Sequence, residues 1–154
     1  MIIWIASYPK SGNTWIRSFI TAYYFCENGI FDINKLSLIE DYPNKQFFRE
    51  KVKQGEIHKH WETSQKRIRD QKKVKFLKTH NSLITAFGND FTKPEYSLGV
   101  IYVIRDPRNV ITSVKNHNDL DSYDQALKFM QDENKVLEDY PHLKNYAKTN
   151  IVNS

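Results

Sequence analysis

The residues best suited to chemistry in this sequence form a short polar segment directly after an apolar N-terminal run. Residues 2–6 are apolar, and residues 7–15 then combine Gly12, several hydroxyl side chains and Lys10. A helix is predicted next, from apolar residues at helical spacing: Ile16, Phe19, Ile20 and Tyr23. A strand, a tight turn and a helix N-terminus together bind anions, because free N–H groups and the helix dipole point at the ligand. The segment therefore predicts a site for a nucleotide phosphate or a phosphosulfate, with Lys10 as a fixed cation.

This segment is not an ordinary nucleoside triphosphate loop. When the pattern G-x-x-x-x-G-K-[ST] is laid on residues 7–14, Gly12 and Thr14 fit it. Ser7 then stands in place of the first glycine and Asn13 in place of the lysine, while Lys10 lies three residues too early. A capped strand–turn–helix that binds no ligand is the alternative interpretation.

The segment resembles the 5′-phosphosulfate-binding loop of the sulfotransferases that use 3′-phosphoadenylyl sulfate, where Y-P-K-S-G-T-T-W is usual. Here Asn13 replaces a threonine and keeps a small hydrogen-bonding side chain. The resemblance implies that Lys10 neutralises charge on the bridging and sulfuryl oxygens as the bond breaks. It implies a donor site made of the following residues: Lys10, Ser11, Gly12, Asn13, Thr14 and Trp15.

A second apolar run, residues 100–104, ends in Arg105, and Ser113 follows eight residues later. Asp106 and Pro107 predict the start of a helix, because aspartate caps helices and proline is tolerated at the first helical position. In the sulfotransferases an arginine at a strand end and a serine eight residues later hold the 3′-phosphate, and the resemblance implies this role for Arg105 and Ser113. A guanidinium offers phosphate a bidentate fork, and a hydroxyl on the next helix can donate from the side.

A third segment, residues 74–78, is typical of a short strand and leads into Thr79 and His80. Sulfotransferases commonly carry K-T-H at such a strand end. The resemblance implies that His80 is the base that deprotonates the acceptor and that Lys78 lies near the sulfuryl group. Imidazole suits this work because its ordinary pKa, near ~6.5, lets it take a proton at neutral pH. The residues alone leave open a structural histidine and an inert lysine.

The other histidines give weaker signals. His58 and His60 lie in charged, helix-like surroundings, so we expect them on the solvated surface, and two ligands are too few for a closed metal site. His117 follows Ser113 by four residues and would border the nucleotide site, whereas His142 carries no signal. No metal is predicted.

Composition indicates one soluble domain over residues 1–154, with 40% hydrophobic and 27% charged residues. No apolar run approaches the roughly 20 residues that span a bilayer, and no signal peptide is recognisable. Cys26 is the only cysteine, so no disulfide or oxidising compartment is implied, and we expect it in the core of the first helix. These features predict a cytoplasmic protein without a membrane partner.

The net charge of +5 raises the question of nucleic acid. Much of the excess lies in residues 66–73, which we interpret as a solvated helix face, because the run lacks the interleaved aromatics that stack on bases. An anionic donor accounts for some positive field near the site. No nucleic-acid partner is predicted.

Strands alternating with helices predict a three-layer, P-loop-like α/β fold with a parallel sheet flanked by helices. All three motifs then fall at the carboxyl ends of strands. Helices are also predicted over residues 82–87 and 123–137, and a polar helix-like region over residues 44–73. Its expected buried side comprises Phe47, Phe48, Ile57, Trp61 and Ile68.

The sequence therefore predicts sulfuryl transfer from 3′-phosphoadenylyl sulfate to a hydroxyl or amine of a small-molecule or glycan acceptor. The alternatives are a P-loop phosphotransferase that uses ATP–Mg²⁺ and a truncated, non-catalytic nucleotide-binding module. Sulfotransferases usually run further and add a closing loop, so we expect the fold to be incomplete at its C-terminus. We also expect an exposed sheet edge that favours a homodimer, and weak activity of this chain alone.

Overall fold

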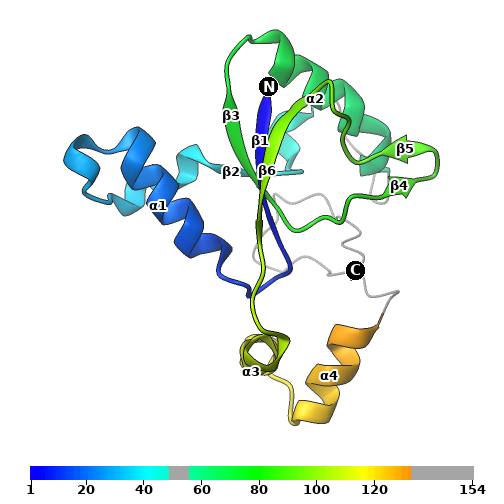
Figure 1. Ribbon diagram of the computed structural model, residues 1–154. Coiled ribbons are helices and arrows are strands. Elements are labelled where there is room, and N and C mark those ends of the chain that lie inside the picture. Colours follow the sequence, from blue (N-terminus) through cyan, green and yellow to red (C-terminus); the bar gives the residue numbers. More distant parts are fainter. Residues whose placement is uncertain (49–55, 133–154) are drawn as a thin grey trace.

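The computed structural model describes residues 1–48 and 56–132 and shows an α/β fold built on one parallel sheet (Figure 1). The sheet has the order β2-β3-β1-β6, and each neighbouring pair is parallel. Its strands are β2 (Glu40–Asp41), β3 (Lys75–Thr79), β1 (Ile2–Ser7) and β6 (Ser97–Val103). The central strand β1 is paired on both sides and covered on both faces, so it reads as a continuous apolar run.

The sheet is flanked by helices. In Figure 1, α1 lies on one side of the sheet and α2 on the other, while α3 and α4 lie below the end of β6. The four α-helices have these bounds: α1 (Asn13–Phe25), α2 (Trp61–Asp70), α3 (Pro107–His117) and α4 (Tyr123–Gln131). Short 3-10 turns cover Glu27–Gly29, Ile33–Leu38, Lys45–Phe47 and Ile57–His60. This arrangement confirms the predicted parallel sheet flanked by helices.

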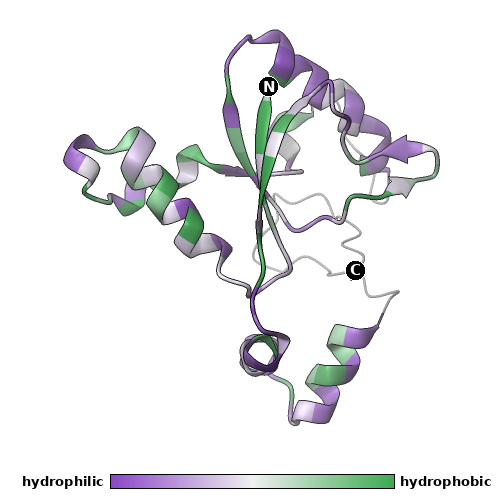
Figure 2. Cartoon of the chain, in the orientation of Figure 1, coloured by the Kyte–Doolittle hydropathy of each residue, from purple (hydrophilic) through white to green (hydrophobic). Residues whose placement is uncertain are grey.

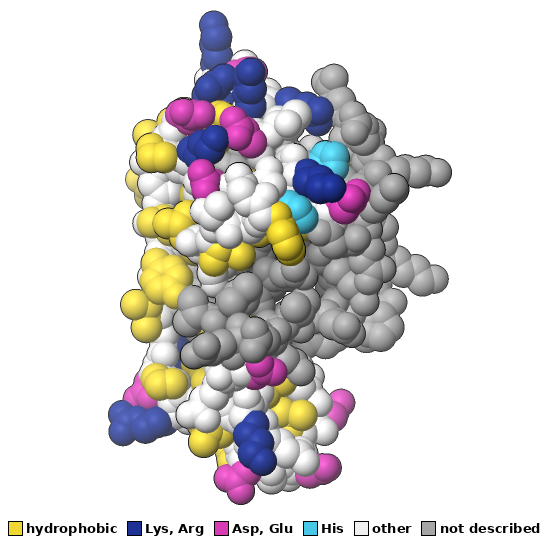
Figure 3. Space-filling view, turned by 90° about the vertical axis from the view of Figure 1, so that its right-hand side faces the viewer, with side chains coloured by type: hydrophobic (Ala, Val, Ile, Leu, Met, Phe, Trp, Pro, Cys, Tyr) yellow, Lys and Arg dark blue, Asp and Glu magenta, His cyan; other side chains and the backbone are white. Residues whose placement is uncertain are grey.

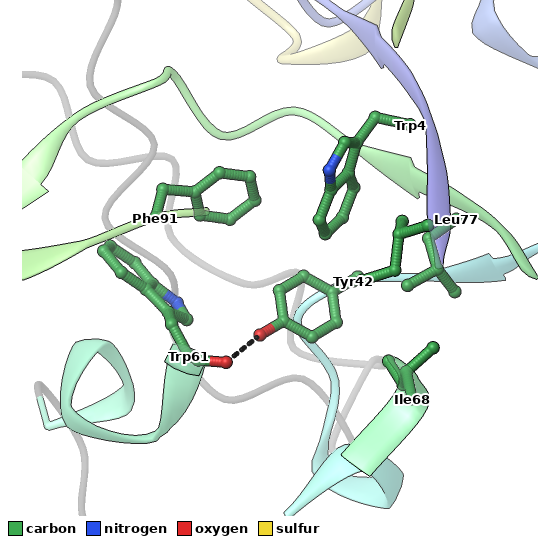
Figure 4. Close-up of a cluster of buried hydrophobic side chains, with 7 residues drawn as sticks. Trp4, Tyr42, Trp61, Ile68, Leu77 and Phe91 are labelled. Atoms are coloured by element: carbon green, nitrogen blue, oxygen red, sulfur yellow. Dashed lines mark hydrogen bonds between the residues drawn. The ribbon is translucent and has the colours of Figure 1, made fainter. Parts of the chain in front are cut away.

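The larger core lies between the sheet and α2 and is rich in aromatic rings (Figure 4). Trp4 of β1 meets the rings of Tyr42 and Phe91, each at 5.3 Å between centroids. The Tyr42 hydroxyl donates to the carbonyl oxygen of Trp61 at 3.3 Å, so the buried phenol keeps a polar partner. α2 is mostly hydrophilic in Figure 2, and Trp61 and Ile68 are among its few buried positions.

A smaller core joins α3 to α4. Val110 and Val114 of α3 pack against Ala126 of α4, and Tyr8, just after β1, packs on the same cluster. α3 begins as the sequence predicts: Asp106 caps it by accepting from the Arg108 N–H at 2.9 Å, and Pro107 is its first residue. The loop after β1 is thereby tied to the helix that follows β6.

Two predicted helices are corrected by the structure. Residues 82–87 contain strand β4 (Thr85–Ala86), which forms an antiparallel hairpin with β5 (Asn89–Asp90). The two linking residues, Phe87 and Gly88, both have positive φ, at 48° and 78°, as a two-residue hairpin turn of type I′ requires. Over residues 44–73 the described part is helical only in short 3-10 turns and α2; residues 49–55 lie outside the described part.

The predicted burial of the polar region is largely confirmed, because Phe48, Ile57, Trp61 and Ile68 are buried and Phe47 is partly buried. Cys26 is not a core residue of the first helix; it is half-buried and follows the last residue of α1. The predicted helix over residues 123–137 is described as α4 up to Gln131, and Leu137 and His142 lie outside the described residues. In the described part of the chain, no helix has the length and apolar character needed to cross a membrane.

Candidate active site

The three predicted motifs meet at the carboxyl ends of the parallel strands β1, β3 and β6. β1 lies between β3 and β6 and runs parallel to both, so Ser7, Thr79 and Val103 end neighbouring strands in the same direction. Two contacts confirm that the segments beyond these ends adjoin. His80 contacts Ser7, and Nη1 of Arg105 donates to the carbonyl oxygen of Lys10 at 3.3 Å. Such an edge is where open α/β sheets bind ligands.

The segment from Tyr8 to Gly12 forms a tight loop that leads into α1. The Ser11 N–H donates to the Tyr8 carbonyl at 3.2 Å, and the Trp15 N–H donates to the Gly12 carbonyl at 3.0 Å. Lys10 and Gly12 both have left-handed backbone conformations, with φ of 68° and 104°. Left-handed residues among right-handed ones turn successive N–H groups toward one concave side, and the first N–H groups of a helix have no intrahelical acceptor. The loop therefore has the backbone of an anion site.

The side chains of this loop differ in exposure. Ser11 and Asn13 are buried, whereas Thr14 and Trp15 are exposed at the start of α1. Among these four residues, Thr14 and Trp15 are thus the ones that solvent can reach. Lys10 is partly buried, and its carbonyl is held by Arg105.

The elements after β6 bring further positive charge to the loop. Arg105 is exposed directly after β6, and Ser113 lies partly buried within α3. Burial lowers the pKa of His117, and the positive charge of Lys10 lowers it further. That His117 borders the nucleotide site stays a prediction.

His80 is held by both oxygens of Ser7. Its Nδ1 lies 2.7 Å from the Ser7 carbonyl oxygen and 3.2 Å from Ser7 Oγ. Burial lowers the pKa of His80 to about 4, and the positive charge of Lys78 adds to this, while the hydrogen bond to Ser7 opposes it. The pKa is thus well below the ordinary value assumed from the sequence, and the imidazole is neutral at physiological pH. A neutral imidazole has one nitrogen free to accept a proton.

Lys78 is paired with Asp41. Its ammonium lies 3.1 Å from Asp41 Oδ1, and the two residues are direct partners in the pairing of β2 with β3. Arg17 of α1 lies 3.6 Å from the same carboxylate and donates to the Ile39 carbonyl at 2.6 Å. Sequence reasoning did not find Asp41 or Arg17, because a two-residue strand leaves no apolar pattern and their partners are distant in sequence.

The prediction that His58 lies on the solvated surface is wrong. His58 is only 8% exposed and stacks on Phe87 with 5.0 Å between ring centroids. The hairpin β4–β5 brings Phe87 over this histidine, and the sequence predicted a helix there. His60 is partly exposed and lies 5.9 Å from the Phe48 ring. Among the described residues, no three side chains of the metal-binding types form a cluster suited to an ion.

A family model for the sulfotransferase domain matches residues 2–151. The chain belongs to the sulfotransferase family. A comparison with curated proteins found no match. Membership confirms the resemblance drawn from the three motifs and makes the protein a transferase for which the transfer of a sulfuryl group is the supported class of reaction.

The left-handed backbone of Gly12 predicts a loss when a side chain is added there. A Cβ at Gly12 would meet no atom within 4 Å, so the cost comes from φ of 104° alone. Gly12→Ala should lower the free energy of unfolding by about 1–2 kcal/mol, the ordinary cost of a left-handed L residue, as measured by urea denaturation.

Gly99→Ala is the matched control, since a Cβ there also meets nothing within 4 Å and no left-handed φ is involved. Gly99→Ala should leave stability nearly unchanged or raise it slightly. Equal losses from both substitutions would contradict the assignment of strain to Gly12.

The buried, neutral His80 also predicts a dependence of stability on pH. The unfolded chain binds a proton at the ordinary pKa of 6.5, and the folded chain only at about 4. Between these values the unfolded state binds more protons, so the free energy of unfolding falls as pH falls from about 6.5 to about 4. The loss should reach about 2 kcal/mol at about pH 5 relative to pH 7.

The measurement is urea denaturation of the wild type and His80→Gln at both pH values. The variant cannot be protonated at this position and should lose correspondingly less stability in acid. If both proteins lose the same amount, His80 is not the group that the folded state keeps neutral.

Proposed function

We propose that the protein transfers a sulfuryl group from 3′-phosphoadenylyl sulfate to a hydroxyl or amine of a small-molecule or glycan acceptor. The observation that carries this proposal is the position of Ser7. Ser7 is the last residue of β1, directly before the loop, and its two oxygens hold the imidazole of His80. This contact supports a donor site and a base for the acceptor at one strand end.

The donor is proposed to bind along the loop and the adjoining strand end. The backbone N–H groups of Gly12 to Thr14, with the Thr14 hydroxyl, hold the 5′-phosphate, and Trp15 lies next to them. The Ser11 N–H closes the loop by donating to the Tyr8 carbonyl, and its residue belongs to the donor site through the loop it shapes. Arg105 and Ser113 hold the 3′-phosphate. The hydrogen bond from Arg105 to the Lys10 carbonyl supports this, because it links the two phosphate sites in one arrangement. We expect these groups to supply the positive charge that Mg²⁺ gives a kinase, so that no metal is required.

The transfer is proposed to be a single displacement at sulfur. The acceptor oxygen or nitrogen forms a bond to sulfur while the bond from sulfur to the 5′-phosphate oxygen breaks. The electron pair of the broken bond leaves on the phosphate, which is released as part of adenosine 3′,5′-bisphosphate. The proton of the acceptor moves to the free nitrogen of His80, and Lys10 stabilises the negative charge that grows on the leaving oxygen. Lys78, which is paired with Asp41, lies near the sulfuryl group in this proposal.

The two phosphate sites predict that adenosine 3′,5′-bisphosphate binds more tightly than adenosine 5′-phosphate. Arg105→Ala should weaken binding of the bisphosphate about ten- to a hundredfold, since a hydrogen bond to a charged group contributes roughly 1.5–3 kcal/mol. Isothermal titration calorimetry measures both affinities, with ATP–Mg²⁺ as a third ligand.

Arg108→Ala is the matched control, because Arg108 lies three residues further along but its side chain is 89% exposed and paired with Asp106. It should change affinity by less than about threefold, as expected for a screened surface charge. Equal binding of the two adenosine nucleotides, or preference for ATP–Mg²⁺, would remove the proposed roles of Arg105 and Ser113.

Substitutions of the proposed base, His80, and of the loop lysine, Lys10, should affect the reaction in different ways. His80→Ala should lower turnover by about 10²–10⁴ and leave donor affinity nearly unchanged, because the imidazole acts on the acceptor proton. Lys10→Ala should lower turnover by about 10²–10³, as for the loss of one preorganised electrostatic donor. Transfer of radiolabelled sulfate from the donor to a panel of alcohols, phenols and amines measures both.

Lys66→Ala serves as the control, since Lys66 is exposed on α2, away from the carboxyl ends of the strands. Its turnover should equal that of the wild type. Near-full turnover of His80→Ala with an alcohol would require a different base.

We further propose that the protein is cytoplasmic and forms a homodimer through the edge of β6. The single cysteine supports a reducing compartment.

The homodimer is proposed from the exposed edge of the sheet. β6 is the last strand of the described sheet, and Val100 and Tyr102 on it are 61% and 57% exposed. Figure 3 shows hydrophobic side chains gathered along its left side. This side of the molecule faces the viewer in Figure 1, where β6 passes in front of β1. Two copies related by a twofold axis can pair such edges.

Val100→Lys should therefore weaken self-association, because a lysine on an edge strand opposes pairing with another edge. Val74→Lys is the matched control: Val74 is 55% exposed but precedes β3. Sedimentation velocity should show a shift toward the monomer for Val100→Lys alone. A wild-type monomer over the full concentration range would end the dimer proposal.

A further inference from the structure

The side chain of Asn13 is turned toward the end of strand β1. It is only 5% exposed, and its Nδ2 donates to the Ile5 carbonyl and to Ser7 Oγ, both at 3.1 Å. The orientation of the amide follows from chemistry, because the Ile5 carbonyl accepts only and must face the nitrogen. Both amide hydrogens of the Asn13 side chain therefore bond to β1. These bonds connect the first residue of α1 to the last residues of that strand.

The next link runs from Ser7 to His80. Ser7 is 3% exposed and ends β1, and its carbonyl oxygen lies 2.7 Å from His80 Nδ1. A carbonyl oxygen has no hydrogen to give, so a contact this short requires the proton on Nδ1. The other nitrogen, Nε2, then carries the lone pair. The neutral imidazole accordingly presents Nε2, and not Nδ1, as the atom that can accept a proton.

We propose that Asn13 is a positioning residue for His80 that acts through Ser7. By clamping the Ser7 hydroxyl and the Ile5 carbonyl, its side chain fixes the end of β1 so that the Ser7 carbonyl holds the hydrogen on Nδ1 of His80. The side chain of Asn13 thus acts on the strand end that holds His80. This inference rests on the proposed role of His80 as the base.

The test begins with the tautomer of His80, which needs no turnover. Long-range ¹H–¹⁵N correlation spectra of the uniformly ¹⁵N-labelled chain distinguish a hydrogen on Nδ1 from one on Nε2. The assignment of His80 comes from the missing signals in His80→Gln. The wild type at neutral pH should show the Nδ1–H form. A wild type in the Nε2–H form would overturn the proposal at this step.

Two variants then remove hydrogen bonds between Asn13 and β1, one from the side of Asn13 and one from the side of Ser7. Asn13→Ala deletes both donors, and Ser7→Ala deletes the hydroxyl while it keeps the carbonyl. Each should convert the single Nδ1–H form into a mixture of tautomers, with the larger effect in Asn13→Ala. Ser18→Ala is the matched control, because Ser18 also lies on α1 and its hydroxyl donates within the helix, to the Thr14 carbonyl at 2.9 Å. Ser18→Ala should retain the wild-type spectrum.

Turnover and binding separate positioning from a general loss of structure. Asn13→Ala should lower kcat about 10- to 100-fold, as expected when a reacting group is misplaced by a fraction of an ångström to an ångström. Its affinity for adenosine 3′,5′-bisphosphate should change less than threefold, because the loop backbone is retained. Asn13→Thr, which keeps one donor of the two, should fall between Asn13→Ala and the wild type, and is read in the same way if Asn13→Ala does not fold.

The outcomes keep the two proposals apart. Wild-type tautomer and wild-type kcat in Asn13→Ala, or in Asn13→Thr if that variant replaces it, would overturn the positioning role, whatever the enzyme transfers. Failure of the wild type to bind adenosine 3′,5′-bisphosphate would overturn the proposed function and leave the tautomer result standing as a property of the fold.

Discussion

The parallel pairing of β1 with β3 on one side and β6 on the other is the constraint on which the site depends. Parallel strands require crossover connections, so their carboxyl ends gather at one edge although the segments beyond them are far apart in sequence. The ring of His80 reaches Ser7, and the guanidinium of Arg105 reaches Lys10 across 95 positions of the chain. An antiparallel neighbour would place its loop at the opposite edge. The direction of the strands therefore determines whether the three motifs meet.

The electrostatics of the site follow from the meeting of these segments at the carboxyl ends of the strands. Lys10, Lys78, Arg17 and Arg105 bring positive charge to the end of the sheet, and among their described partners the Asp41 carboxylate balances part of it. Burial and this positive field both keep His80 neutral, which leaves it ready to accept a proton at physiological pH. A low pKa also makes a weak base. In the proposed reaction the negative charge of the donor would raise the pKa of this imidazole.

The sequence is informative where chemistry and local backbone rules coincide. Local sequence patterns are enough to predict the loop after β1, the Asp106 cap and the three principal strands. Strand β2 is two residues long and exists only through its pairing with β3, so it leaves no period to detect. The hairpin at Phe87 and the burial of His58 escape detection because a positive φ at a phenylalanine and a stacked imidazole both depend on tertiary contacts.

Asn13 shows that a motif can be recognised while the contacts of one of its side chains stay hidden in the sequence. An anion loop binds through backbone N–H groups, so the pattern tolerates several side chains at this position, and the resemblance assigns the whole segment to the donor. At the first position of α1, however, the side chain projects back toward the strand that precedes the loop, as helical side chains lean toward the N-terminus. Asparagine supplies two donors in that direction, and the Ile5 carbonyl and the Ser7 hydroxyl accept both. A threonine hydroxyl has one donor and cannot make both bonds. Asparagine at this position thus ties the start of α1 to the end of β1 through two hydrogen bonds, where a threonine would make one.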